Sequence, residues 1–181
     1  MNIHIVYYSG TGGTTRVANC FQQSFEKRGN TVQVSALNKP NPPEDSADFL
    51  VLLYAVYACN EPLPVTEWLR NLPAKSGGKA AVISVSGGGE VSPNTGCRAA
   101  AIRSLEKKGY DVLYEDMIVM PSNWIVPVPD ELAALLLRAA PKKAEQIVEN
   151  ILAGKHSRTK PKLIDRLFSR FGRLEQHGGK A

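Results

Sequence analysis

The segment Ser9-Gly10-Thr11-Gly12-Gly13-Thr14-Thr15 lies between an apolar run and a helical pattern, close to the start of the chain. The run before it, Ile3 to Tyr8, is rich in β-branched and aromatic residues, which is typical of a buried strand. The pattern after it repeats apolar residues at helical spacing and stops at Gly29. The first N–H groups of a helix lack helical partners, and the helix dipole favours an anion there. The segment therefore predicts an anion-binding turn with hydroxyl groups as neutral donors.

Strand and helix patterns alternate along the chain after this segment. The run Phe49 to Tyr54 is apolar throughout, as expected for a strand buried on both faces. The patterns predict strands over 3–8, 31–34, 49–54, 80–85 and 112–119, and helices over 14–28, 65–72, 97–108 and 130–152, the last of them interrupted near Pro141. This alternation predicts an α/β three-layer sandwich, in which a five-stranded parallel sheet carries helices on both faces.

The charge of the 181-residue chain is unevenly distributed. Residues 1–153 hold 14 Lys and Arg against 15 Asp and Glu, a net charge of −1, whereas residues 154–181 hold 8 against 2, a net charge of +6. We therefore expect one domain over 1–153 and a basic tail over 154–181. A nearly neutral domain does not suggest a nucleic-acid partner.

The cysteines, the longest apolar run and the N-terminal sequence indicate the cellular location of the protein. Cys20, Cys59 and Cys97 are widely spaced, so neither a disulfide framework nor a metal site is expected. The longest uncharged apolar run, 49–59, is much shorter than the ~20 residues of a membrane-spanning helix. The N-terminus has no signal-peptide pattern. These features predict a cytoplasmic protein.

Three other site types fit the segment 9–15 poorly. A Walker loop needs a lysine after its glycines, and this segment has none. A dinucleotide-binding fingerprint needs a third glycine, but Thr15 stands at that position. It also needs an acidic residue at the end of the second strand, where Val34-Ser35-Ala36 has none. A response-regulator domain needs acids where Tyr8-Ser9 and Tyr54 stand.

The segment resembles the phosphate signature of flavodoxins. The residues in register with that signature are Tyr7, Ser9, Gly12, Thr14 and Ala18. The resemblance covers residues 1–153 and is greatest to the flavodoxin halves of bacterial flavodoxin–ferredoxin fusion proteins, in which a stretch like Met120-Pro121-Ser122-Asn123-Trp124 follows the last strand. It implies an FMN cofactor. The cysteine-rich ferredoxin segment is absent, so no iron–sulfur cluster is expected on this chain.

Ligands of such sheets bind beyond the carboxyl ends of the strands, which defines the candidate site. We expect the phosphate of FMN at Ser9, Gly10, Thr11, Gly12, Gly13 and Thr14. We expect the flavin ring near Ala55, Val56, Tyr57, Ser86, Gly87, Gly88, Gly89 and Trp124, with the two aromatic residues able to stack on it. The alternatives are that these aromatic residues are ordinary half-buried ones and that the glycine run is a mobile loop. Cys59 is expected to be a small hydrophobe rather than a redox thiol. No catalytic residue and no metal ligand is assigned.

The resemblance implies a redox protein that carries electrons between a reductase or ferredoxin and an acceptor. The alternatives are an NAD(P)H-dependent quinone reductase and a non-redox assembly module with a degenerate flavodoxin fold.

In the tail, apolar residues from Leu163 to Leu174 recur at helical spacing beside Lys and Arg. Such a helix can lie on an anionic membrane, in a protein groove, or back on the domain. Residues 157–160 are expected to be a solvated linker.

Overall fold

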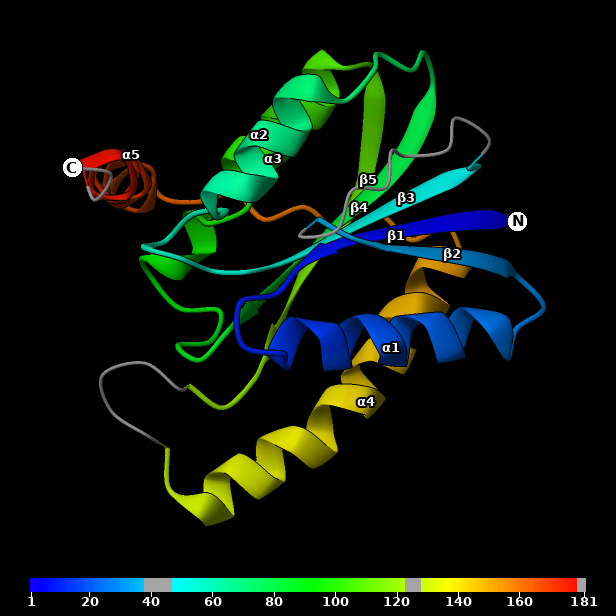
Figure 1. The fold of residues 1–181 in the computed structure, drawn as a ribbon, viewed down its shortest axis with the longest axis horizontal. Coiled ribbons are helices and arrows are strands. Elements are labelled where there is room, and N and C mark those ends of the chain that lie inside the picture. Colours follow the sequence, from blue (N-terminus) through cyan, green and yellow to red (C-terminus); the bar gives the residue numbers. More distant parts are fainter. Residues whose placement is uncertain (38–46, 123–127, 179–181) are drawn as a thin grey trace.

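The computed structural model describes residues 1–37, 47–122 and 128–178 (Figure 1). A five-stranded parallel sheet forms its centre, with strand order β2-β1-β3-β4-β5. The strands are β1 (Asn2–Tyr8), β2 (Thr31–Ala36), β3 (Phe49–Ala55), β4 (Gly78–Ser86) and β5 (Tyr110–Val119). The predicted α/β fold with a five-stranded parallel sheet is confirmed.

Helices cover both faces of the sheet. Helices α1 (Gly13–Glu26) and α4 (Asp130–Leu152) pack on one face, and α2 (Leu63–Asn71) and α3 (Ala99–Lys107) pack on the other (Figure 1). The central strand β3 serves both layers, because successive side chains of a strand point to opposite faces. Val51 and Leu53 join the core under α1 and α4, whereas Leu52 and Tyr54 join the core under α2 and α3. This double burial explains the uninterrupted apolar run.

Helix α4 is continuous through Pro141, so the predicted interruption there is wrong. A proline inside a helix removes one hydrogen bond and costs about 3 kcal/mol. Ala144, Ile147 and Val148 follow it and are fully buried in the core against the sheet. Their burial offsets the local cost, since each fully buried Val or Ile side chain contributes about 1.5–3 kcal/mol.

Within the described residues, no helix has the length and apolarity needed to cross a membrane.

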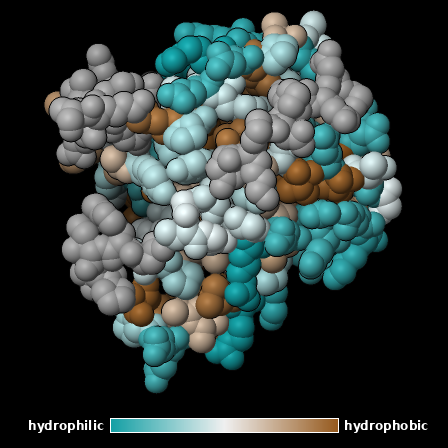
Figure 2. Space-filling model, viewed as in Figure 1, coloured by the Kyte–Doolittle hydropathy of each residue, from teal (hydrophilic) through white to brown (hydrophobic). Residues whose placement is uncertain are grey.

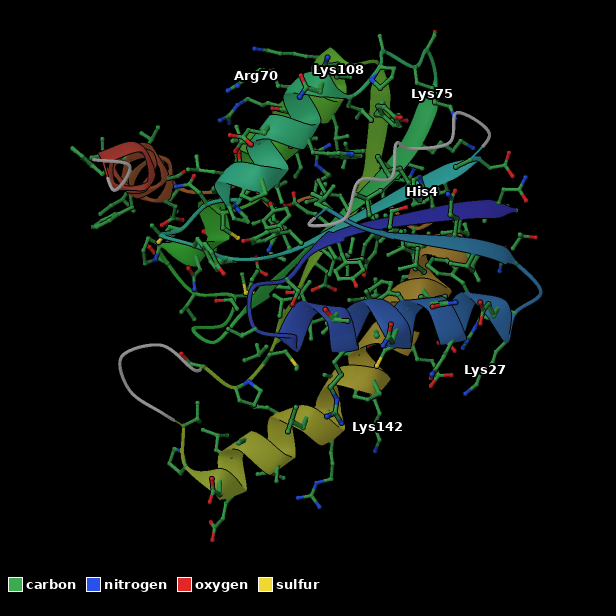
Figure 3. The ribbon with its side chains drawn as sticks, viewed as in Figure 1. His4, Lys27, Arg70, Lys75, Lys108 and Lys142 are labelled. Atoms are coloured by element: carbon green, nitrogen blue, oxygen red, sulfur yellow. The ribbon has the colours of Figure 1, made fainter. Side chains whose placement is uncertain are left out.

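The two ends of the sheet have different contacts. At the amino ends of the strands, Lys75 Nζ donates to the carbonyl of Ala47 at 2.6 Å and Lys108 Nζ to that of Arg70 at 2.8 Å (Figure 3). At the opposite ends lie the loops 9–12, 56–62 and 87–98, which carry the predicted site. Inside the sheet, His4 is buried with its Nε2 2.9 Å from Ser35 Oγ (Figure 3).

The segment before the last helix lies along the outer edge of β5, so the predicted solvated linker is wrong. Ser157 donates its N–H to the carbonyl of Leu113 and accepts the N–H of Glu115, at 3.0 and 2.8 Å. Arg158 donates to the carbonyl of Val112 at 2.9 Å. Edge strands have unpaired backbone groups, and this segment satisfies part of the edge of β5.

Helix α5 (Leu163–Gly178) packs on the loops that follow β3 and β4, at the left of Figure 1. Asp165 accepts hydrogen bonds from the hydroxyls of Ser92 and Thr95. Ser169 Oγ donates to Asn60 Oδ1 at 2.5 Å, and Asn60 Nδ2 donates to the carbonyl of Ser169 at 2.7 Å. The tail thus contacts the domain through polar side chains, which the hydropathy pattern did not predict.

Candidate functional site

The loop between β1 and α1 carries the first predicted group of site residues. Gly12 is the N-cap of α1 and has φ +94°, a left-handed conformation that favours glycine. Ser9 Oγ accepts the N–H of Gly12 at 3.1 Å, which closes the turn. A Cβ atom built on Gly12 or Gly13 would meet nothing within 4 Å. Gly10 and Thr11 are exposed beside them, so the loop is open on its outer side.

Thr14, in the first turn of α1, has a buried hydroxyl. The residue is 2% exposed, and its Oγ1 has no hydrogen-bond partner. The first backbone hydrogen bond of α1 joins the N–H of Arg16 to the carbonyl of Gly12 at 3.0 Å. The N–H groups of Gly13, Thr14 and Thr15 therefore precede the helical ladder. The first turn of α1 has no acidic residue, so it presents donors and the positive end of a dipole to an anion.

Tyr57 connects the loop after β3 to this first loop. Its ring packs edge-on against Tyr8, with centroids 6.2 Å apart and planes at 83°. Its hydroxyl lies so close to Gly10 that a Cβ atom there would be 2.3 Å from Tyr57 Oη. Burial and the neighbouring Tyr8 hydroxyl raise the pKa of Tyr57. The side chain is 41% exposed, so the structure brings the predicted ring-stacking residue to the predicted phosphate loop.

The two residues after Tyr57 form a tight turn in an unusual backbone conformation. Ala58 and Cys59 have φ +46° and +57°, and Tyr57 and Asn60 exchange two backbone hydrogen bonds of 2.9 Å across them. Two-residue turns with positive φ at both central positions favour Asn-Gly, so Ala-Cys carries strain here. Cys59 lies half-buried in this turn, beyond the end of β3.

The loop after β4 is filled by the protein's own side chains. Ser86 Oγ accepts the N–H of Gly88 at 3.1 Å and Asn94 Nδ2 at 3.2 Å. A Cβ atom on Gly87 would be 2.6 Å from Ser122 Cβ, and one on Gly88 would be 2.8 Å from Asn94 Nδ2. These two glycines are therefore required by close packing within the chain.

Ala55 and Val56 complete the described part of the predicted ring site. Ala55 ends β3, and the N–H of Val56 donates to the carbonyl of Val85 at 2.9 Å, which fixes the loop to β4. Trp124 lies outside the described residues.

A buried ion-pair cluster next to these loops was not predicted from the sequence. Arg98 is fully buried; it donates to Glu115 at 2.8 Å, to Ser84 at 2.9 Å and to Glu90 at 2.5 Å. Its Nη2 also donates to Thr159 of the tail at 3.1 Å. Burial lowers the pKa of Arg98, but the contacts with Glu90 and Glu115 raise it more, so the guanidinium stays charged. A lone arginine in a helical pattern gives no signal of such a cluster.

Cys97 precedes this arginine and is a buried thiol. Burial raises the pKa of Cys97 to about 11, so the group is protonated at neutral pH and a poor nucleophile. Burial also raises the pKa of Tyr54, whose hydroxyl donates to the carbonyl of Cys97 at 3.2 Å. Both groups are buried and hold their protons at neutral pH, so they are structural rather than reactive.

Comparison with known proteins identifies the fold. No protein-family model matches the chain, and no curated protein matches its sequence. Among solved structures, a flavodoxin of Streptococcus pneumonia TIGR4 superposes with a TM-score of 0.63 and 17% identity, over 84% of this chain and 99% of that one. A flavodoxin from the domain Archaea gives 0.56 and 17% over the same shares. An azoreductase from Bacillus anthracis str. Sterne gives 0.59 and 13%, over 83% and 100%. The chain therefore has a flavodoxin-like fold.

Proposed function

We propose that this chain binds FMN and carries electrons between a reductase or ferredoxin and an acceptor protein. The N–H groups of Gly13, Thr14 and Thr15 and the hydroxyls of Ser9 and Thr14 would hold the phosphate. FMN, when bound, supplies the electron transfer, because the protein has to provide only binding and electrostatic tuning.

The observation that carries the proposal is the unpartnered Thr14 Oγ1 at the start of α1. A buried hydroxyl without a partner costs about 1–3 kcal/mol. A phosphate oxygen at the helix N-terminus would accept a hydrogen bond from this hydroxyl and remove that cost. Residues 9–15 contain no lysine, so neutral donors and the helix dipole would have to bind the dianion.

Tyr57 is the residue we assign to the flavin ring. The residue is 41% exposed, and its hydroxyl lies against Gly10, within the proposed phosphate loop. Aromatic rings stack favourably on flat π-systems, at about 0.5–1.5 kcal/mol beyond area burial. Ala55, Val56 and residues 86–89 would line the other sides of the ring, and Trp124 is assigned to it on the sequence alone.

The narrower parts of the proposal rest on the sequence. They are the similarity to flavodoxin halves of fusion proteins, the cytoplasmic location and a ferredoxin or reductase as partner.

The proposal is tested by adding FMN to the purified flavin-free protein and recording absorbance and flavin fluorescence. We expect saturable binding at one site, with the flavin bands shifted and its fluorescence quenched by Tyr57. A protein that leaves the FMN spectrum unchanged at high concentration would overturn the proposal.

A second candidate, an NAD(P)H-dependent quinone reductase, is favoured by the fold neighbours that are reductases. One of these, a putative quinone reductase from Klebsiella pneumoniae, superposes with a TM-score of 0.57 at 12% identity. Steady-state oxidation of NAD(P)H with a quinone separates the two functions. A carrier shows almost no turnover without its protein partners, whereas a reductase turns over alone.

A further inference from the structure

Helix α5 contacts the domain with its polar face and turns its apolar face outward. Asp165 and Ser169 are 1% and 7% exposed. The large apolar residues of the helix are between 50% and 83% exposed: Leu163, Ile164, Leu167, Phe168 and Phe171. Single exposed apolar residues are ordinary, but a contiguous group of this size marks an interaction surface.

Close contacts fix this rotation of α5. A Cβ atom on Gly172 would be 2.0 Å from the carbonyl oxygen of Ala58, and one on Gly96 would be 2.8 Å from that of Asp165. The carboxylate of Asp165 is also held by two hydroxyls and by the N–H of Lys162. Turning the apolar face inward would break these hydrogen bonds and separate two backbones in direct contact. The outward direction of the apolar face is therefore built into the packing.

The sequence adds positive charge beside this apolar face. Lys162, Arg166, Arg170 and Arg173 recur at intervals of three or four residues, so they form one row along the helix. Residues 154–181 have a net charge of +6.

We propose that α5 lies flat on an anionic lipid bilayer, with its apolar face in the headgroup–acyl boundary and its basic row at the headgroups. Helices of this composition bind membranes through buried apolar area together with attraction to anionic lipid. The bilayer is favoured over a protein groove by geometry. A groove encloses a helix on several sides, whereas α5 is already covered by the domain on one side and offers a single outward face.

This orientation would place the candidate flavin site near the membrane. The polar face of α5 packs on Ala58 and Asn60, which lie within three residues of Tyr57. The carboxyl ends of β3 and β4 are at the same end of the molecule as α5 (Figure 1). Lipid binding does not require FMN, so the two proposals are tested separately.

The experiment is co-sedimentation of the full chain with vesicles of phosphatidylcholine, alone or mixed with phosphatidylglycerol. We expect binding to the mixed vesicles only, and weaker binding as salt is raised, because the Debye length shortens. The variant Phe168→Ser/Phe171→Ser should bind at least tenfold more weakly. Changing Arg166, Arg170 and Arg173 to Gln should weaken it roughly a hundredfold, at roughly fivefold per cationic residue.

A matched control lies on α4. Leu135 on this helix is 58% exposed, as is Phe171. Figure 2 shows some hydrophobic surface over the projecting part of α4. Leu135→Ser should leave vesicle binding unchanged. Absence of binding to mixed vesicles, or equal binding by the double Phe variant, would overturn the proposal. So would a concentration-dependent dimer without vesicle binding that the Phe changes dissociate, because it would show that a second copy covers the face.

Discussion

The molecule has two glycine-rich loops at the same end of its sheet. They differ in the space around their glycines and in the hydrogen bonds of their hydroxyl groups. In the loop 9–15, Cβ atoms on Gly12 and Gly13 would meet nothing, and the hydroxyl of Thr14 has no partner. In the loop 86–89, Cβ atoms on Gly87 and Gly88 would collide with neighbouring side chains. The hydroxyl of Ser86 accepts two hydrogen bonds. A glycine run by itself is therefore not evidence for a ligand, because close packing within the chain accounts for Gly87 and Gly88.

The largest expected effect concerns the ion pairs that hold the second loop. Arg98→Met leaves Glu115, which is 4% exposed, without its closest cation. Breaking a buried pair by removing one partner costs about 3–5 kcal/mol. We expect the free energy of unfolding, measured in urea, to fall by about this amount. The matched control is Arg103→Met on α3, the helix that begins directly after Arg98; Arg103 is exposed, and its change should cost less than about 0.5 kcal/mol. Equal losses in the two variants would show that the cluster does not hold the loop.

A smaller difference in thermal stability is expected when glycines of the two loops are changed to alanine. The new methyl group of Gly87→Ala would lie 2.6 Å from Ser122 Cβ and 3.1 Å from its Cα, and such overpacking costs about 1–3 kcal/mol. Gly13→Ala meets open space at the first position of α1, where alanine favours a helix by up to about 1 kcal/mol. Thermal melting should show a lower Tm for the first variant and an unchanged or higher Tm for the second. The reverse order would contradict the contrast between the loops.

Removing a hydroxyl should change the free energy of unfolding in opposite directions in the two loops. Ser86→Ala removes an oxygen that accepts two hydrogen bonds, and should lower the free energy of unfolding by about 1–2 kcal/mol. Thr14→Val replaces an unpartnered hydroxyl with a methyl of similar shape, and should raise the stability of the flavin-free protein by about 1 kcal/mol. Urea unfolding of both variants measures the difference. A loss of stability in Thr14→Val would mean that its hydroxyl is satisfied in the flavin-free protein.

The smallest effect concerns pH and the contact of α5 with the loop after β4. Hydrogen bonds from Ser92 and Thr95 lower the pKa of Asp165 below its ordinary 3.8. Because the folded-state pKa is lowered, this group stabilises the fold above its ordinary pKa of 3.8, and the contribution is lost as pH falls through the lower folded-state pKa. Acid titration by circular dichroism should therefore show α5 loosening below that value. Asp165→Asn should remove this step, whereas Asp111→Asn, an exposed change on β5, should keep it.

The fold could be predicted from the sequence because double burial produces a pattern that can be read directly. The strand Phe49–Ala55 is apolar without interruption for this reason, and the glycine-rich turn after the first strand is marked by its place between a strand pattern and a helix pattern. The contacts that distinguish the two loops could not be predicted, because Ser122 and Asn94 reach Gly87 and Gly88 only through the fold. The rotation of α5 was missed for the same reason. Its apolar pattern suggests burial of that face, whereas the contacts of Asp165 with Ser92 and Thr95 are long-range.

The most direct test of the account compares FMN with riboflavin, which has no phosphate, in the wild-type and Thr14→Val proteins. Hydrogen bonds to charged groups contribute about 1.5–3 kcal/mol each. The account therefore predicts that FMN affinity falls roughly tenfold to a hundredfold in the variant while riboflavin affinity changes little. Equal losses for the two flavins, or no loss for FMN, would show that the loop 9–15 does not hold the phosphate.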